Sequence, residues 1–169
     1  ETGINPSGKL AMTFPYSTGQ IPIYYNRRKS GRGHQGFYKD ITSDPLYPFG
    51  HGLSYTEFKY GTVTPSVTKV KRGDRLSVEV TVTNVGARDG AETVHWFISD
   101  PYCSITRPVK ELKHFEKQLI KAGETKTFRF DIDMERDFGF VNEDGKRFLE
   151  AGEYHILVQG QTVKIELID

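Results

Sequence analysis

The sequence lacks the features that define several large classes of protein. Its one cysteine, Cys103, excludes an internal disulfide framework and a multi-cysteine zinc site. Its 23 basic and 22 acidic residues nearly cancel, so no global field attracts nucleic acid or an anionic membrane. No run approaches the ~20 consecutive apolar residues of a membrane span, and no signal-peptide pattern follows Glu1. The 169 residues therefore predict a globular domain, alone or with an extension.

The composition of the first 56 residues is typical of an irregular segment. Five of the eight prolines lie there, glycine and tyrosine are frequent, and no apolar periodicity persists. Residues 9–14 and 20–25 are the two places where a short strand is expected. Residues 24–52 are interpreted as one long loop, and loops above about 15 residues in a compact domain usually indicate function, disorder or contact with something absent. We therefore expect this chain to be part of a larger protein.

After residue 56 the apolar residues recur at every second position. Leu76, Val78, Val80 and Val82 alternate with polar residues, as expected of a strand with one buried face. Similar runs follow, separated by turn sequences such as Asp89-Gly90. The pattern predicts seven or eight strands in an antiparallel β-sandwich, with one helical turn within residues 133–140.

A series of carboxylates at every second position resembles a calcium loop only superficially. It consists of Asp131, Asp133, Glu135 and Asp137, and Arg136 stands where the glycine of an EF-hand loop is required. We interpret the series as a solvated strand edge that runs into a turn. Nothing in the sequence raises a pKa within it, so no acid/base pair is predicted.

The nucleophile and metal patterns are also missing. The five histidines show no metal-ligand spacing, and His95 and His155 fall within predicted strands. Cys103 is interpreted as an ordinary loop residue, and no Gly-x-Ser-x-Gly elbow is present. We predict no catalytic residue, no metal ligand and no cofactor-binding residue in this chain.

A basic cluster and a set of loop aromatics remain. Arg27, Arg28, Lys29 and Arg32 are interpreted as a solvated loop, because the neighbouring strands lack a basic-aromatic face for nucleic acid. Aromatic loop residues either stack on sugar rings or anchor a domain contact, and both readings stay open. The candidate interdomain or substrate-rim contacts are Tyr24, Tyr25, Arg27, Tyr47, Phe49 and Tyr55.

Several stretches stand out as longer motifs. In chain order they are Asn5-Pro6-Ser7-Gly8-Lys9-Leu10, Gly19-Gln20-Ile21-Pro22-Ile23-Tyr24-Tyr25-Asn26, Leu46-Tyr47-Pro48-Phe49-Gly50-His51-Gly52-Leu53-Ser54-Tyr55-Thr56, Asp89-Gly90-Ala91-Glu92 and Thr106-Arg107-Pro108-Val109-Lys110-Glu111-Leu112-Lys113. Together and in this order they resemble the C-terminal part of family 3 glycoside hydrolases of the β-glucosidase or β-xylosidase branch. Ala11 departs from the proline that this family usually has there.

The resemblance implies a fold and a division of the chain. Residues 1–56 would be the remnant of an α/β domain with a wrapping linker, and residues 57–169 an immunoglobulin-like, fibronectin type III-like sandwich. The family's aspartate nucleophile and glutamate acid/base belong to upstream domains, and neither motif matches a position here. The family habit further implies a periplasmic or secreted enzyme.

This chain would then act as a scaffold and interdomain clamp, inactive alone, with the upstream catalytic domains as partner and the parent's carbohydrate as substrate. No nucleic acid, membrane or cofactor is expected. The rivals are a protein-interaction module and a carbohydrate-binding module. The second rival requires a planar strip of exposed aromatics from Tyr102, Trp96 or Phe97, although the alternation around Trp96 places that side chain in the core.

Overall fold

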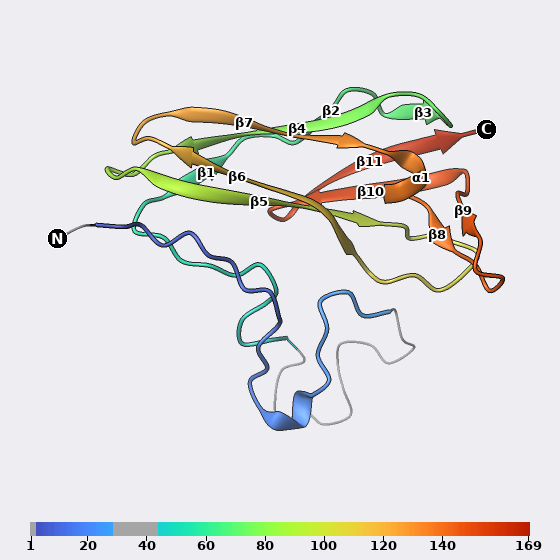
Figure 1. The fold of residues 1–169 in the computed structure, drawn as a ribbon, viewed down its shortest axis with the longest axis horizontal. Coiled ribbons are helices and arrows are strands. Elements are labelled where there is room, and N and C mark those ends of the chain that lie inside the picture. Colours follow the sequence, from blue (N-terminus) through green and yellow to red (C-terminus); the bar gives the residue numbers. More distant parts are fainter. Residues whose placement is uncertain (1–2, 29–43) are drawn as a thin grey trace.

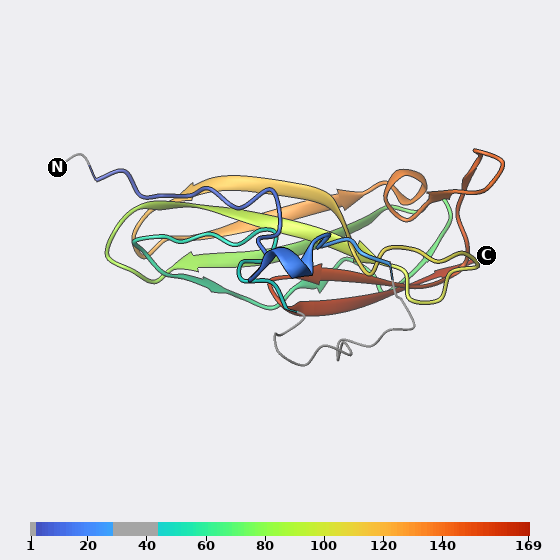
Figure 2. The same ribbon diagram turned by 90° about the horizontal axis from the view of Figure 1, so that it is seen from below.

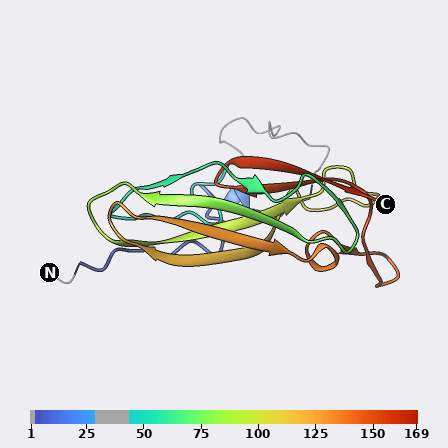
Figure 3. The same cartoon turned by 90° about the horizontal axis from the view of Figure 1, so that it is seen from above.

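Two β-sheets face each other and enclose the apolar residues of the alternating runs (Figure 1). The computed structural model describes residues 3–28 and 44–169. One sheet has the order β1-β4-β2, with β7 on the other edge of β4, and the second has the order β3-β11-β10-β5-β6. A two-stranded ribbon, β8-β9, lies apart from both. Seen from above, the sheet of β4 and β7 covers the second sheet (Figure 3).

The elements of the sandwich follow in chain order. They are β1 (Phe58–Tyr60), β2 (Thr64–Pro65), β3 (Lys69–Lys71), β4 (Leu76–Asn84), β5 (Gly90–Ser99), β6 (Glu111–Ile120), β7 (Thr125–Ile132), α1 (Met134–Asp137), β8 (Phe140–Val141), β9 (Arg147–Phe148), β10 (Gly152–Val158) and β11 (Gln161–Ile168). All neighbouring strands pair antiparallel except β3 and β11, which are parallel. The predicted all-β, fibronectin type III-like sandwich is confirmed.

The core lies between the sheets and is built from the inward positions of each strand. Val78, Val80 and Val82 of β4 face it, and so does Trp96 of β5, which is fully buried as the alternation predicts. The register between β5 and β6 shifts between Trp96 and Phe97. Phe97 lies outside the core cluster. The outer face of β5 therefore presents Phe97 to whatever covers that sheet.

What covers it is the segment before β1, which we call the arm, residues 3–28 and 44–57. The arm projects from the outer side of the five-stranded sheet and crosses β5 and β10 when seen from below (Figures 1 and 2). Its two stretches run side by side through backbone bonds from Leu10 N to His51 O and from Phe14 N to Tyr47 O, each 2.8 Å long.

The strands expected at residues 9–14 and 20–25 are not formed. Only Phe14 makes an isolated bridge in the first stretch, and the second begins with a 3-10 turn, Thr18–Gln20. Prolines at positions 15 and 22 remove backbone donors, which limits ladder formation. Residues 29–43, which hold Lys29, Arg32, Phe37 and Tyr38, lie outside the described residues.

The helical turn predicted within residues 133–140 is α1. Asp133 caps it by accepting from Arg136 N at 3.1 Å. The expectation of a solvated carboxylate edge is wrong for Asp137, which is buried, accepts from Asp133 N and pairs with Arg136 at 2.8 Å. In residues 3–28 and 44–169, no helix is long and apolar enough to cross a membrane.

Candidate functional site: the arm and the sheet face beneath it

An aromatic cluster attaches the arm to the outer face of β5. Tyr25 stacks on Phe49 with ring centroids 4.2 Å apart, and both rings meet the edge of Phe97 at about 6 Å. Phe49 also contacts the His95 ring at 5.8 Å. Such ring pairs stabilise a contact by about 0.5–1.5 kcal/mol beyond the area they bury. The cluster joins both stretches of the arm to one strand.

Two glycines allow the close approach. Gly50 has a φ of +83°, and a Cβ there would lie 3.1 Å from His95 Nδ1. A Cβ on Gly52 would collide with the carbonyl of Gly8 in the other stretch of the arm. The Phe49-Gly50-His51-Gly52 sequence therefore lets the chain pass tightly between β5 and residues 8–10.

A buried ion pair is the second attachment. Lys9 Nζ reaches Glu92 of β5 at 2.9 Å, and Tyr60 of β1 donates its hydroxyl to the same carboxylate oxygen at 2.9 Å. Burial, together with the Glu92 carboxylate, raises the pKa of Tyr60 far above its usual range. This triad links the arm to both sheets. The triad was not predicted from the sequence, although Glu92 stands at an inward position of an alternating strand, where a carboxylate is unusual.

Asn5 fastens the start of the arm to its end. Its side-chain oxygen accepts from Tyr55 N at 2.8 Å and from Ser54 Oγ at 3.1 Å, and its amide nitrogen donates to Asp89 O at 3.4 Å. Thr56 then donates to Asn84 Oδ1 at 2.7 Å. These bonds satisfy backbone groups next to β1 that a free linker would leave to water.

The arm also holds the segment that leads into β6. Val109 N donates to Arg27 O at 2.8 Å, and Leu112 N donates to the Tyr25 hydroxyl at 3.3 Å. The side chain of Lys110 lies over the Phe97 ring, 4.7 Å from its centroid. Residues 107–112 are thus a platform between the arm and the sandwich.

The six candidate contact residues divide into two groups. Tyr25 and Phe49 face the sandwich in the cluster described above. Tyr24 and Tyr55 point to solvent with 63% and 71% of their surface exposed. Tyr47 is partly exposed and stacks on His51 at 4.9 Å, and the Arg27 side chain is exposed. The structure brings Tyr24, Tyr25, Arg27 and Phe49 together around one cavity of about 500 Å³.

A second cavity, of about 570 Å³, lies on the other side of Phe49. It is enclosed by the 48–52 stretch, by His95 and Phe97 of β5, and by the β10–β11 turn at Gln159. Lys9 and Lys110 supply its cations. Pro48, Phe49 and Lys110 line both cavities, so they form the partition between them.

The arm is rich in exposed apolar and aromatic side chains. Those among its described residues are Ile4, Met12, Phe14, Tyr16, Ile21, Tyr24, Leu46, Tyr47, Leu53 and Tyr55. So many exposed large apolar residues in one segment are unusual on a monomeric soluble protein and point to an interaction surface.

The other chemical candidates have structural roles. Burial raises the pKa of the Cys103 thiol to about 11, so the reactive thiolate is scarce at neutral pH. His155 contacts Glu153 at 2.7 Å on the sheet surface. The described residues contain no cluster of three or more His, Cys, Asp or Glu that could hold a metal ion. The aromatic strip expected from Tyr102, Trp96 or Phe97 is not formed by these residues, because Trp96 and Phe97 are buried and only Tyr102 of the three is exposed.

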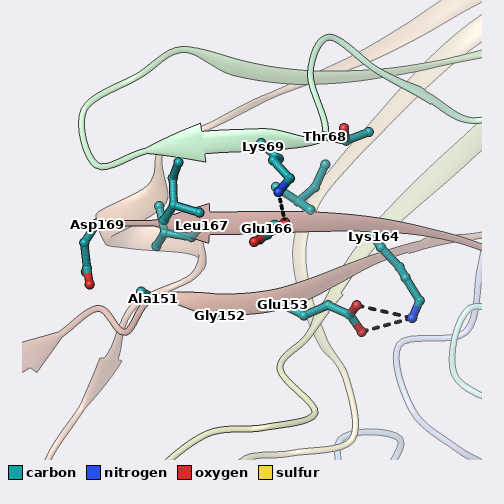
Figure 4. A pocket seen from close by; sticks show the side chains of 11 residues that line it. Thr68, Lys69, Ala151, Gly152, Glu153, Lys164, Glu166, Leu167 and Asp169 are labelled. Atoms are coloured by element: carbon teal, nitrogen blue, oxygen red, sulfur yellow. Dashed lines mark hydrogen bonds and ion pairs between the residues drawn. The ribbon is translucent and has the colours of Figure 1, made fainter.

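A groove of about 730 Å³ lies over β3, β10 and β11 and carries charged side chains (Figure 4). Lys69 pairs there with Glu166 at 2.9 Å, and Lys164 pairs with Glu153 at 3.1 Å. Because these four side chains already pair with each other at the surface, they are not held ready for a ligand.

We expect the docking of the arm to weaken at acid pH through His95. Burial lowers the pKa of this imidazole, Lys9 lowers it further, and Glu92 opposes both. The folded chain therefore binds fewer protons at His95 than the unfolded chain, whose imidazole titrates near 6.5. The stabilisation is present above that pH and is lost as the pH falls through the lower, folded value. Urea unfolding of the wild type and of His95→Phe between pH 7.5 and 5 should give curves that diverge below about pH 6.5, and parallel curves would contradict this prediction.

Comparison with known proteins agrees with this geometry. The model of the glycosyl hydrolase family 3 C-terminal domain matches residues 2–55, and the fibronectin type III-like domain matches residues 92–162. The periplasmic beta-glucosidase of Salmonella typhimurium is 40% identical over 170 residues, covering 96% of this chain and 22% of that protein. A beta-xylosidase of Formosa agariphila is 40% identical over 156 residues, covering 92% of this chain and 21% of that protein.

Solved structures give the same result. The beta-glucosidase of Listeria innocua in complex with glucose superposes with a TM-score of 0.90 at 38% identity, covering 98% of this chain and 25% of that one. The chain thus spans between a fifth and a quarter of the length of these relatives. In sequence, in fold and in the order of its two matched regions, the chain is the C-terminal part of a family 3 glycoside hydrolase, including its fibronectin type III-like domain.

Proposed function

We propose that this chain is the non-catalytic scaffold and interdomain clamp of a longer glycoside hydrolase. One observation carries the proposal: the arm is fixed to the sandwich through the aromatic cluster and the Lys9–Glu92 pair, and it still exposes ten large apolar or aromatic side chains. A surface held in one position and left apolar is suited to bind a preformed partner with little ordering cost. The partner is the set of catalytic domains that precede residue 1 in the same polypeptide.

The activity of the whole protein is part of the same proposal. It would hydrolyse β-linked glucosides or related glycosides with retention, using a carboxylate nucleophile and a second carboxyl group about 5 Å away. Both groups would come from upstream domains. Residues 1–56 would complete the upstream domain and its linker, residues 57–169 would form the sandwich, and the enzyme would act in the periplasm or outside the cell.

The clamp is favoured over a carbohydrate-binding module by the placement of the aromatics. Tyr25, Phe49 and Phe97 cover one another and leave no flat row of open rings. Tyr24 and Tyr55 are open, but they belong to the arm and not to the sandwich. Their use as substrate-rim contacts would require the upstream domains to place a substrate there, so that role also depends on the clamp.

The test compares the chain with the full polypeptide. We expect the purified chain to leave an aryl β-glucoside intact, because it carries no catalytic carboxylate, and the full polypeptide to hydrolyse it. In the full polypeptide, Tyr24→Ser with Tyr55→Ser should split one thermal unfolding transition into two, since these side chains would leave the apolar interface. Tyr102→Ser, an equally exposed tyrosine on the sandwich, is the matched control. Turnover by the stringently purified chain would overturn the non-catalytic role, and an unsplit transition would overturn the clamp.

A further inference from the structure

Lys110 is a half-buried cation in the partition between the two cavities beside the arm. Its ammonium group lies over the Phe97 ring at 4.7 Å, and Pro48 and Phe49 flank it in both cavities. Burial lowers the pKa of this amine, because the charged form loses part of its water shell. A ring face compensates only part of that loss.

Two carboxylates near Lys110 in the sequence or in the arm contact are already engaged. Glu111 pairs with Arg107 at 2.9 Å and with Lys113 at 3.5 Å, and Glu92 pairs with Lys9. Across residues 3–28 and 44–169, no carboxylate is paired with Lys110. An ammonium group that has lost part of its water shell is stabilised by an anionic partner.

The cavity of about 570 Å³ offers room for that partner. Its cations are Lys9 and Lys110, its imidazoles are His51 and His95, and no Asp or Glu is among its lining residues. Gln159, on its rim, has a left-handed φ of 44°, which a glycine would adopt at less cost. Because Lys9 is neutralised by Glu92, the uncompensated positive charge among the described lining residues is that of Lys110. The rim carries a polar side chain, Gln159, in an unusual backbone conformation.

We propose that this cavity receives a carboxylate side chain, aspartate or glutamate, from the part of the polypeptide that precedes residue 1. This inference rests on the proposed clamp and adds the chemistry of its contact. A carboxylate would give Lys110 a charge-assisted partner without disturbing the Lys9–Glu92 pair. A protein segment is favoured over a sugar because the Phe97 ring beneath Lys110 is buried and closed to stacking. About three quarters of the length of the relatives lies outside this chain and could supply the segment.

Zero-length carbodiimide coupling of the full polypeptide tests the proposal. The reagent joins an amine to a carboxylate only where the two groups are in contact, and mass spectrometry then identifies the linked peptides. We expect a link from Lys110 to an aspartate or glutamate upstream of residue 1. The Lys164–Glu153 pair, 3.1 Å apart on the exposed sheet face, is an internal positive control.

Variants separate this contact from the clamp as a whole. If Lys110 pairs with a carboxylate, salt should screen the pair and lower the melting temperature of the full polypeptide. Lys110→Arg keeps the charge but cannot be coupled by the reagent, so it should lose the link and keep this salt effect. Lys110→Gln should lose both the link and the salt effect. Lys117→Gln, at an exposed position of β6, should keep both.

A link from Lys110 to a carboxylate within residues 1–169, or no link while Lys164 couples, would overturn the proposal. So would a Lys110-dependent rise in the melting temperature of the chain with cellobiose, which would assign the cavity to a saccharide. If the Tyr24/Tyr55 double variant uncouples the domains and Lys110 gives no upstream link, the clamp stands and only this inference fails. If the double variant leaves the domains coupled and Lys110 gives no upstream link, the clamp and this inference both fail.

Discussion

Replacing Arg107 by methionine is expected to lower the free energy of unfolding of the chain by about 3–5 kcal/mol. The guanidinium pairs with Asp100 at 3.1 Å and with Glu111 at 2.9 Å, and it donates to Phe138 O at 2.7 Å. The Arg107 and Asp100 side chains are only 4% and 5% exposed. Methionine fills much of the same space but leaves the Asp100 carboxylate buried beside one backbone donor, Tyr102 N. Urea unfolding measures the loss.

Arg129→Met is the matched control. Arg129 also contacts two carboxylates, Asp131 and Glu79, but its side chain is 54% exposed, so solvent screens both pairs and the loss should be far smaller than for Arg107→Met. Adding Asp100→Asn to Arg107→Met should recover part of the stability, because the uncompensated charge is removed. Equal losses for Arg107→Met and Arg129→Met would show that burial of the Asp100 pair contributes little.

The consequence extends to the arm. Arg107 lies at the start of the 107–112 platform, whose Val109 amide and Lys110 side chain contact the arm and its cavities. We therefore expect Arg107→Met to expose the Val109 amide to hydrogen exchange as well as to destabilise the sandwich. The Arg107 ion pairs and the docked arm are therefore expected to be energetically coupled through residues 107–112.

The sandwich was predictable from the sequence because each of its long strands carries its own local signal. The alternation of apolar and polar residues in β4 and β5 predicts which face of each strand is buried. The burial of Trp96 follows from that alternation alone. The short pairings of β2, β3, β8 and β9 were not predicted individually. Strands of two or three residues are too short to show a period, and their position depends on the neighbours that pair with them.

The arm was not predictable in the same way. Its expected strands at 9–14 and 20–25 fail because bonds between residues 10–14 and 47–51 replace a ladder, and contacts of that sequence separation leave no periodic trace. Aromatic composition did identify Tyr25 and Phe49, which lie in the contact with β5. It missed Lys9, Glu92 and His95, since their importance arises only when the arm and the sheet meet.

Phe49→Ala is expected to detach the arm from the sheet and to lower the free energy of unfolding by about 2–3 kcal/mol, somewhat less than for a fully buried phenylalanine. Phe49 is the one ring that contacts all of Tyr25, His95 and Phe97 among the described aromatic pairs. Its removal leaves a gap that the polar rim of the cavity cannot fill. Hydrogen exchange should show faster exchange at Leu10 and Val109, whose amides donate to arm carbonyls, while the β4 amides paired with β7 stay protected.

Leu53→Ala is the control within the arm, because Leu53 is exposed and should change the stability of the chain very little. If Phe49→Ala behaved like Leu53→Ala, the aromatic cluster would not be what holds the arm, and the Lys9–Glu92 pair would have to do so alone. In the full polypeptide the order of effects should differ. Leu53 is one of the exposed apolar side chains that we assign to the upstream domains, so its substitution should weaken interdomain docking there, whereas Phe49→Ala should weaken docking by releasing the arm itself. Comparing the chain alone with the full polypeptide therefore distinguishes Phe49, which holds the arm on the sandwich, from Leu53, which would contact the upstream domains.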